Sequence, residues 1–350
     1  MQRCNQLAQL GRGSVAPNPM VGSVLVYQDR IIGEGYHKQY GQAHAEVNCI
    51  ASVKKEDKHL IDQSTLYVSL EPCAHFGKTP PCADLIIDKK IPHVLIGCRD
   101  PFEQVNGKGI EKLKAAGIKV EQGVLEAECK SFNKRFFTFH KERRPYIILK
   151  WAQTLDNRMA SFGRERLKIS NEATNRLVHK WRSEEAAILV GTNTALADDP
   201  QLGARLWPGK NPVRVVLDMN LRLPDTLQVF DGKIPTVIFN KYQHTLPFGQ
   251  TPVGLLEGVN YYQVTEDVSF VHQLLNGLYQ LGVQSILVEG GAQLLQSFID
   301  DDTWDEARVI TNETLVIGNG LPAPDLGLAN LVKSEQIFSD SIRTYKRTES

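Results

Sequence analysis

Short apolar runs rich in valine and isoleucine alternate with segments of helical period along the first part of the chain. Four runs have the length and composition of strands: residues 21–27, 31–35, 65–70 and 94–97. Apolar residues at helical spacing follow His44 and Cys82, and they recur in a predicted helix over residues 126–139 that carries Phe132, Phe136 and Phe139. This alternation predicts an α/β sandwich, in which the aromatic side chains of the last helix pack on the sheet.

The predicted first domain ends at a charged stretch, Lys141-Glu142-Arg143-Arg144-Pro145. Proline breaks a helix and favours extended backbone before it, and an apolar run over residues 146–149 follows directly. We therefore predict one domain over residues 1–142 and a second over residues 146–350. The second domain alternates in the same way, with helices at 170–182, 271–281 and 292–299 and strands at 187–190, 213–217, 236–239 and 285–288.

Charge and cysteine content narrow the class of protein. The chain has 40 basic and 40 acidic residues, without the basic excess of a dedicated nucleic-acid-binding protein. No apolar run near the start is long enough for a signal peptide or a membrane span, so we expect a soluble cytoplasmic protein. Six cysteines are too few for a disulfide scaffold, which fits a reducing compartment. Four of them are interpreted as ordinary buried or partly buried thiols: Cys4, Cys49, Cys98 and Cys129.

A candidate metal site stands out in the first domain. His44 opens a predicted helix, Cys73 follows the predicted strand 65–70, and Cys82 begins another predicted helix. Three nitrogen and sulfur ligands with an open fourth position are typical of a catalytic zinc, and helix N-termini favour the thiolates that zinc requires. Glu46, two positions after His44, is placed to take a proton from a zinc-bound water and to pass it to the leaving amine. His75 lies only two positions from Cys73, so we assign it to the substrate wall rather than to the metal.

This layout matches that of zinc deaminases, with one deviation. Eight residues separate the two cysteines, where the common pattern has two. Two other interpretations of the zinc site remain open at this point. A nucleic-acid deaminase is disfavoured by the balanced charge and by the lack of an aromatic and basic groove pattern. A non-catalytic zinc-binding interaction module would not explain why the carboxylate of Glu46 stands beside an open zinc position.

Three segments resemble the deaminase half of the bifunctional riboflavin-biosynthesis deaminase/reductase family: APNPMVG at residues 16–22, HAEV at 44–47 and EPCAHFGKTPPC at 71–82. The long gap between the cysteines is the form of the motif found in that family. The resemblance implies a cytidine-deaminase-like three-layer αβα domain, with Asn18, His75 and Thr79 lining the pyrimidine and phosphate pocket. The first helix starts abruptly at Met1, which suggests that a few residues are absent before it.

The second domain contains no Gly-x-Gly-x-x-Gly sequence, so a nicotinamide cofactor would not be held by a Rossmann fingerprint. The predicted strand 285–288 instead runs into Glu289-Gly290-Gly291 and a helix, where backbone N–H groups could meet a phosphate. Such turns are commonly structural. However, this turn, residues 150–156 and a predicted polar loop over 191–202 resemble the reductase half of the same family. That resemblance implies a dihydrofolate-reductase-like α/β fold that uses NADPH.

The resemblance also implies individual site residues in the second domain. The predicted NADPH contacts are Ala152, Lys168, Arg182, Thr194, Asp198, Gly291, Ala292, Gln293, Leu294, Leu295, Gln296 and Ser297. The predicted substrate contacts are Lys150, Arg166, Leu202, Arg205 and Glu289. The two arginines Arg166 and Arg205 suit a ribose phosphate because a guanidinium donates a bidentate fork. Asn157 stands where the family usually has Gly, and Lys168 where it often has Trp.

The sequence thus predicts a two-step enzyme with one zinc ion per chain. The first domain would deaminate a phosphoribosylated diaminopyrimidinone, and the second would reduce its ribosyl group to ribityl with NADPH. The partners expected are this small-molecule substrate and further copies of the chain, most simply in a dimer, with no nucleic acid and no membrane. An alternative is a deaminase whose second domain has lost reductase activity, which Asn157 and Lys168 make conceivable.

Overall fold

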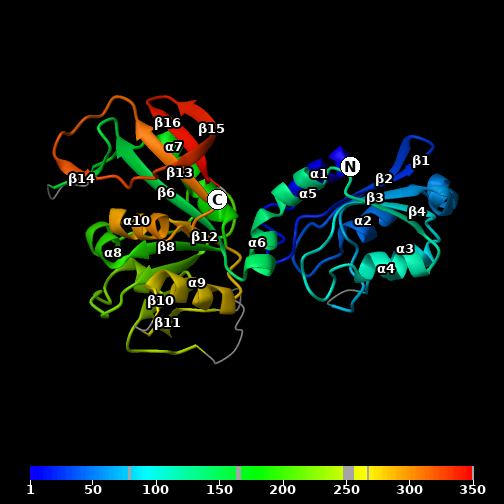
Figure 1. Cartoon of the computed structure of the whole chain (residues 1–350), viewed down its shortest axis with the longest axis horizontal. Helices are drawn as coiled ribbons and strands as arrows, with labels where there is room; N and C mark the ends of the chain where they lie inside the picture. The colour runs from blue at the N-terminus through cyan, green and yellow to red at the C-terminus, as the bar shows by residue number, and fades with distance from the viewer. Residues whose placement is uncertain (78–79, 163–166, 247–255, 266–267, 349–350) are drawn as a thin grey trace. The chain divides into compact units, whose positions relative to one another are not determined.

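The computed structural model describes residues 1–77, 80–162, 167–246, 256–265 and 268–348. The chain folds into two compact units, Met1–Glu142 and Arg143–Ser350 (Figure 1). Among the described residues, no helix is long and apolar enough to cross a membrane. All six cysteines have free thiols.

The first unit is built on a five-stranded sheet. Its strands are β1 (Gly22–Tyr27), β2 (Arg30–Tyr36), β3 (Thr65–Leu70), β4 (His93–Cys98) and β5 (Lys119–Gln122), in the order β2-β1-β3-β4-β5. The strand β1 pairs antiparallel with β2 and β3, whereas β3, β4 and β5 run parallel. The carboxyl ends of β3 and β4 therefore lie at the same edge, which is where the site is built.

Helices cover both faces of this sheet. They are α1 (Gln2–Gln9), α2 (Ala45–Ala51), α3 (Cys82–Asp88), α4 (Lys108–Ala115), α5 (Glu126–Phe132) and α6 (Lys134–Glu142), with a 3₁₀ segment η1 (Lys55–Gln63). One core packs α2, α3 and α4 on the strand residues Leu66 and Val68. The opposite face packs Cys4 and Leu7 of α1 on Val24. The unit is thus the expected three-layer αβα domain (Figure 1).

The predicted single helix over residues 126–139 is wrong, because two helices meet at Asn133. Asn133 has non-helical backbone angles, φ −106° and ψ 20°. Its side chain accepts a hydrogen bond from the Met20 amide at 2.8 Å and donates one to the Met20 carbonyl at 2.9 Å. These two tertiary bonds hold Asn133 outside the helix. After the break Phe136 and Phe137 pack against Leu70 and Cys98, whereas Phe132 and Phe139 are only half-buried.

The second unit contains a nine-stranded sheet in the order β11-β10-β9-β8-β12-β6-β13-β16-β15. Its strands are β6 (Tyr146–Thr154), β8 (Ala187–Gly191), β9 (Val213–Leu217), β10 (Thr236–Asn240), β11 (Val259–Gln263), β12 (Ser285–Val288), β13 (Glu306–Asn312), β15 (Ala329–Ile337) and β16 (Asp340–Arg347). The strands from β11 to β13 pair in parallel, and β16 and β15 complete the sheet antiparallel. A separate pair joins β7 (Arg158–Ser161) to β14 (Gly320–Pro322).

Four helices cover the two faces of the large sheet. They are α7 (Glu172–Glu184), α8 (Thr192–Asp198), α9 (Phe270–Gln280) and α10 (Ala292–Asp300). One face packs α9 and α10 through Leu274 and Phe298. The other face packs α7 through Val178 and α8 through Ala195. Because side chains alternate along a strand, these helices contact the strand residues that face away from α9 and α10.

The helix α8 corrects a second expectation, since the sequence predicts a loop over residues 191–202. Ala195 is fully buried and packs on Val190 and Val216, so one small residue anchors the helix to the sheet. The Thr192 hydroxyl donates to the Leu217 carbonyl at the start of the helix. Tertiary packing of Ala195 therefore outweighs the polar composition of this segment.

Candidate functional sites

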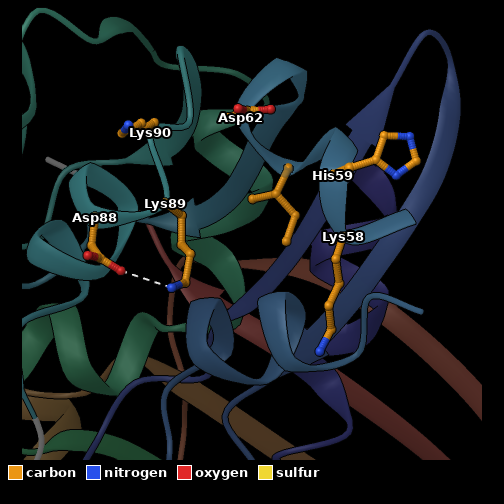
Figure 2. Close-up of a pocket in the computed structure, with 7 residues that line it drawn as sticks. Lys58, His59, Asp62, Asp88, Lys89 and Lys90 are labelled. Atoms are coloured by element: carbon orange, nitrogen blue, oxygen red, sulfur yellow. Dashed lines mark hydrogen bonds and ion pairs between the residues drawn. The ribbon is translucent and has the colours of Figure 1, made fainter. Parts of the chain in front are cut away.

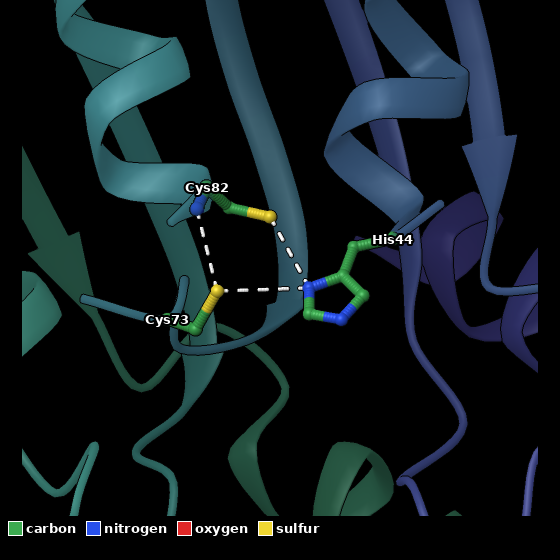
Figure 3. A group of neighbouring side chains, drawn as sticks. All are labelled: His44, Cys73 and Cys82. Carbon is green, nitrogen blue, oxygen red and sulfur yellow. Dashed lines mark hydrogen bonds between the residues drawn. The ribbon is translucent and has the colours of Figure 1, made fainter. Parts of the chain in front are cut away.

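The three predicted zinc ligands lie together in the first unit (Figure 3). His44 is the N-cap of α2, Cys73 follows β3, and Cys82 is the first residue of α3. Their ligand atoms all lie within 4.8 Å of one another. They form the one group of three or more His, Cys, Asp or Glu side chains with this spacing in the described part of the chain.

The distances fit a tetrahedral zinc ion. The Nδ1 atom of His44 lies 3.6 Å from Cys73 Sγ and 3.3 Å from Cys82 Sγ. Zinc bonds of about 2.3 Å to sulfur and about 2.1 Å to nitrogen place such ligands about 3.6 Å apart. Three protein ligands leave one position of the tetrahedron for water, as in catalytic sites.

The surroundings favour a thiolate at Cys73. A hydrogen bond from the Cys82 thiol lowers the pKa of Cys73 to about 4, outweighing burial, with further help from His44 and the Cys82 amide. The same bond raises the pKa of Cys82, which acts as its donor. The Cys82 amide lies 3.3 Å from Cys73 Sγ, so the first N–H group of α3 faces this sulfur.

Glu46 lies in the first turn of α2, beside its N-cap His44. Its side chain is buried, and burial raises the pKa of the carboxyl group. Burial thus favours the protonated form of Glu46, and a carboxyl group that accepts and releases a proton is what general acid–base catalysis requires.

The predicted substrate residues of this unit lie around the zinc ligands. Asn18 donates to His37 Nε2 at 3.1 Å, and the ring of His37 packs edge-on to His44 with centroids 5.4 Å apart. His75 is half-buried, and its Nδ1 atom has no hydrogen-bond partner among the described residues. Thr79 lies outside the described residues.

The sequence analysis did not predict a role for Glu71, which fixes the segment that carries Cys73. Its buried carboxylate accepts hydrogen bonds from four amides, those of Asp100, Gly107, Gly109 and Ile110, at 3.0 to 3.3 Å. It thereby ties the residues just before Cys73 to the start of α4. A charged residue directly after the apolar strand 65–70 was the available signal.

The second unit brings three predicted residues into one buried cluster, beside the middle of β6 and the carboxyl end of β12. Arg182 of α7 donates two hydrogen bonds to the Glu289 carboxylate, both at 2.7 Å. Lys150 of β6 lies 3.6 Å from the same carboxylate. Burial alone would raise the pKa of Glu289, but the charges of Arg182 and Lys150 outweigh it and lower the pKa to about 2. Glu289 is thus a carboxylate shared by two cations.

The predicted phosphate turn follows this cluster. Gly291 is the N-cap of α10 and has φ 71°, in the left-handed region that favours glycine. A Cβ atom on Gly291 would lie 3.4 Å from the Thr194 hydroxyl, so the starts of α8 and α10 face each other here. The first N–H groups of α10 supply donors for an anion.

The other predicted NADPH residues differ in their surroundings. Ala152 is half-buried in β6, and Leu294 is half-buried with its Cδ2 close to Gly191. Leu295 is fully buried in the core, so only its backbone could meet a ligand. The Gln296 side chain donates a hydrogen bond to the Asp300 carboxylate and accepts one from the Asp325 amide. The Ser297 hydroxyl donates to the Leu294 carbonyl. Ala292 and Gln293 lie in the first turn of α10. Asp198 is exposed at the end of α8, and Lys168 is exposed with Glu172 at 3.6 Å.

The remaining predicted substrate residues lie on the segment after α8. Leu202 is buried and has φ 55°, and Arg205 is exposed. The pKa of the neighbouring His179 falls to about 4, first through burial and then through the charges of Arg182 and Arg205. Arg205 follows Gly203, whose carbonyl accepts a hydrogen bond from Arg182 at 3.2 Å. Arg166 lies outside the described residues.

A shallow hollow at the surface of the first unit is unrelated to these sites. Its lining includes Lys58, His59 and Asp62 of η1, Asp88 at the end of α3, and Lys89 and Lys90 after it (Figure 2). Two adjacent lining residues, Asp88 and Lys89, form an ion pair at 2.9 Å. It lies at the end of α3 opposite Cys82, and none of the zinc ligands lines it.

Comparison with known proteins assigns both units to families. Residues 1–98 match a family model described as the cytidine and deoxycytidylate deaminase zinc-binding region. Residues 145–341 match the model of the RibD C-terminal domain. Fold and site together thus define a zinc-binding deaminase joined to a RibD-type reductase domain.

Relatives cover the whole chain. The riboflavin biosynthesis protein RibD of Aquifex aeolicus is 37% identical, over 96% of this chain and 92% of its own length. That of Bacillus amyloliquefaciens is 38% identical, over 92% of this chain and 86% of its own length. The crystal structure of a diaminohydroxyphosphoribosylaminopyrimidine deaminase/5-amino-6-(5-phosphoribosylamino)uracil reductase from Thermotoga maritima matches with a TM-score of 0.85 and 36% identity, covering 99% of this chain and 97% of that one.

The chain belongs to the RibD family of riboflavin biosynthesis proteins. It is a bifunctional deaminase and reductase that acts on small molecules, with a zinc-binding deaminase domain and a reductase domain that uses NADPH. The expected fold class is confirmed, and the alternatives that the sequence left open give way to an enzyme with both domains.

Proposed function

We propose that the first unit hydrolytically deaminates 2,5-diamino-6-(5-phosphoribosylamino)pyrimidin-4(3H)-one. The second unit would then reduce the ribosyl group of the product to ribityl with NADPH. The two activities named for the Thermotoga maritima relative support this pair of steps. The observation that carries the proposal is the convergence of His44, Cys73 and Cys82 beside the buried Glu46.

In the deaminase unit, His44 Nδ1 and the thiolates of Cys73 and Cys82 would hold the zinc ion. When bound, zinc lowers the pKa of a coordinated water to near neutrality. Glu46 would take one proton from the attacking water and deliver it to the ring nitrogen. It would then move the second proton, from the hydroxyl group added to the carbon, to the amino group, which leaves as ammonia. Asn18 and His75 hold the pyrimidine, with Thr79 toward the phosphate. The hydrogen bond from the Asn18 amide to His37 fixes the direction of its carbonyl oxygen.

In the reductase unit, Lys150 and Glu289 face the ribosyl group that accepts hydride. Arg182 keeps Glu289 ionised, and Arg205 and Arg166 bind the ribose phosphate through their guanidinium groups. The turn from Gly291 and the hydroxyl of Thr194 hold a phosphate of NADPH against the start of α10. Asp198, Ala152, Lys168 and the first turns of α10 complete the cofactor contacts.

Domain limits, location and assembly complete the proposal. Residues 1–142 and 146–350 are the two functional domains, and the reduced thiols fit a cytoplasmic protein.

The chain forms a homodimer in which β15 takes part. This strand ends the nine-stranded sheet, and it exposes Leu331 and Val332 by 54% and 50%. An open edge with apolar side chains favours pairing with a second chain. Light scattering that gives the mass of a monomer would contradict the dimer.

Replacement of Glu46 by Gln tests the deaminase mechanism. Glutamine keeps the shape of the side chain but cannot carry the proton, so ammonia release should fall by about 10² to 10⁴ fold. Zinc content, measured by metal analysis, should stay at one ion per chain. NADPH oxidation with the deaminated nucleotide is the internal control and should be unchanged. Ammonia release at the wild-type rate would refute the role of Glu46.

A further inference from the structure

The largest fully buried side chain in the described residues is the charged Arg214. It lies in β9, where Val213, Val215 and Leu217 face the core under α9 and α10. Since side chains alternate along a strand, Arg214 faces the other side, together with Val216, toward Leu202 and Val229. A guanidinium on an apolar face is costly unless its donors are paired.

The donors of Arg214 are used to hold two loops. Its Nε atom donates to the Gln201 carbonyl at 2.9 Å. Its Nη1 atom donates to the Gln228 carbonyl at 3.0 Å and to the Asp231 carboxylate at 2.7 Å. The hydrogen bond from Arg214 lowers the pKa of Asp231, so the pair is an ion pair at neutral pH. One buried side chain thus joins the segment after α8 to the segment 228–231.

The segment held in this way carries two of the proposed substrate contacts, Leu202 and Arg205. Its backbone is anchored on both sides of Gln201. The Asp199 carbonyl accepts from the side-chain amide of Gln228 at 2.6 Å, and the Gly203 carbonyl accepts from Arg182 at 3.2 Å. Leu202 between them has φ 55°, a strained conformation for leucine. Such a conformation persists where the surrounding bonds determine it.

We propose that Arg214 is a positioning residue for the reductase substrate, because its bond to the Gln201 carbonyl sets the backbone of residues 199–205 and thereby the place of Arg205. This inference rests on the proposed role of Arg205. Arg214 acts through the backbone rather than on the substrate itself, since its side chain is buried and its donors bond groups of the chain. Its expected effect is therefore on substrate binding by the second unit alone.

Steady-state kinetics of the full chain test this proposal. Arg214→Met keeps a long apolar side chain and removes all three hydrogen bonds. The KM for the deaminated nucleotide should rise about tenfold, as expected for the loss of one charged hydrogen bond, with kcat within about threefold. Arg214→Lys, which keeps the charge toward Asp231, should give a smaller rise. The affinity for NADPH and the rate of ammonia release should not change.

Two further variants separate the ways in which the proposal could fail. Arg144→Met removes another half-buried ion pair of the second unit, with Asp305 at 2.6 Å, and should leave the KM unchanged. An unchanged KM in folded Arg214→Met, or an equal rise in Arg144→Met, would overturn the positioning role. Arg205→Ala should raise the KM at least as much as Arg214→Met does. If Arg205→Ala has no effect, the proposed substrate contact itself is wrong, and the role of Arg214 falls with it.

Discussion

Glu289 shows how one residue can serve both stability and binding. Its side chain is only 7% exposed, yet it stays ionised because Arg182 and Lys150 share its carboxylate. Removing one partner of a buried ion pair leaves the others unpaired, at a cost of about 3–5 kcal/mol. The cluster must therefore be intact before it can orient a substrate.

The pH dependence of stability follows from this cluster. The pKa of Glu289 is about 2 in the folded chain against a usual value of 4.5, so its contribution is present above pH 4.5 and is lost as the pH falls toward 2. In urea unfolding of the second unit, the stability difference between wild type and Glu289→Gln should shrink as the pH falls through this range. A difference that stays constant with pH would contradict the ion-pair assignment.

At the residue scale, the zinc ligands could be predicted from sequence because their spacing is a local motif. The roles of Glu71, His37 and Arg214 could not, since the groups that they bond are brought close only by the fold. Arg214 did leave a signal. A charged residue in the middle of the apolar run 213–217 is unusual for a buried parallel strand, whose residues are normally apolar on both faces.

At the element scale, the turn between β6 and β7 accounts for the residue that departs from the family. Asn157 has φ 58°, a left-handed conformation that Asn tolerates better than most residues. Its side-chain oxygen accepts from Gln153 at 2.7 Å, and its carbonyl accepts from the Ala323 amide at 3.0 Å. Asparagine thus keeps the turn that glycine would form. This departure from the family therefore does not argue for a loss of reductase activity.

Substitutions of Asn157 test this explanation of the turn. Asn157→Gly should stay within about 1 kcal/mol of wild type, because glycine adopts the same conformation freely. Asn157→Val should destabilise the second unit by about 1–2 kcal/mol, since a branched side chain is strained at positive φ. Urea unfolding measures both values. Equal stability of the valine variant would show that the turn imposes no such restriction.

Other elements show the limits of sequence patterns. The break between α5 and α6 depends on two hydrogen bonds between Asn133 and the backbone of Met20, more than a hundred positions away. The hairpin of β15 and β16 was not predicted, because β15 is exposed along almost its whole length and lacks an apolar alternation. The buried parallel strands β8, β9, β10 and β12 were predicted, since their runs of Val, Ile and Leu are distinctive. The buried parallel strand β13 was not predicted, because Glu306 and Arg308 interrupt its apolar run.

At the scale of the whole molecule, the two sites are built within separate units that share no site residue. Removing zinc with a chelator should therefore abolish ammonia release and leave NADPH oxidation with the deaminated nucleotide intact. Added zinc should restore ammonia release. Loss of NADPH oxidation on chelation would show that the reductase unit depends on the metal site.

One assay of the zinc-loaded chain with the diaminopyrimidine nucleotide and NADPH tests the two-step reaction most directly. Ammonia and NADPH are followed together in the same sample. We predict that ammonia appears first and that NADPH is then oxidised in equal amount. NADPH oxidation without prior ammonia release, or ammonia release that is never followed by oxidation, would contradict the proposed sequence of two steps.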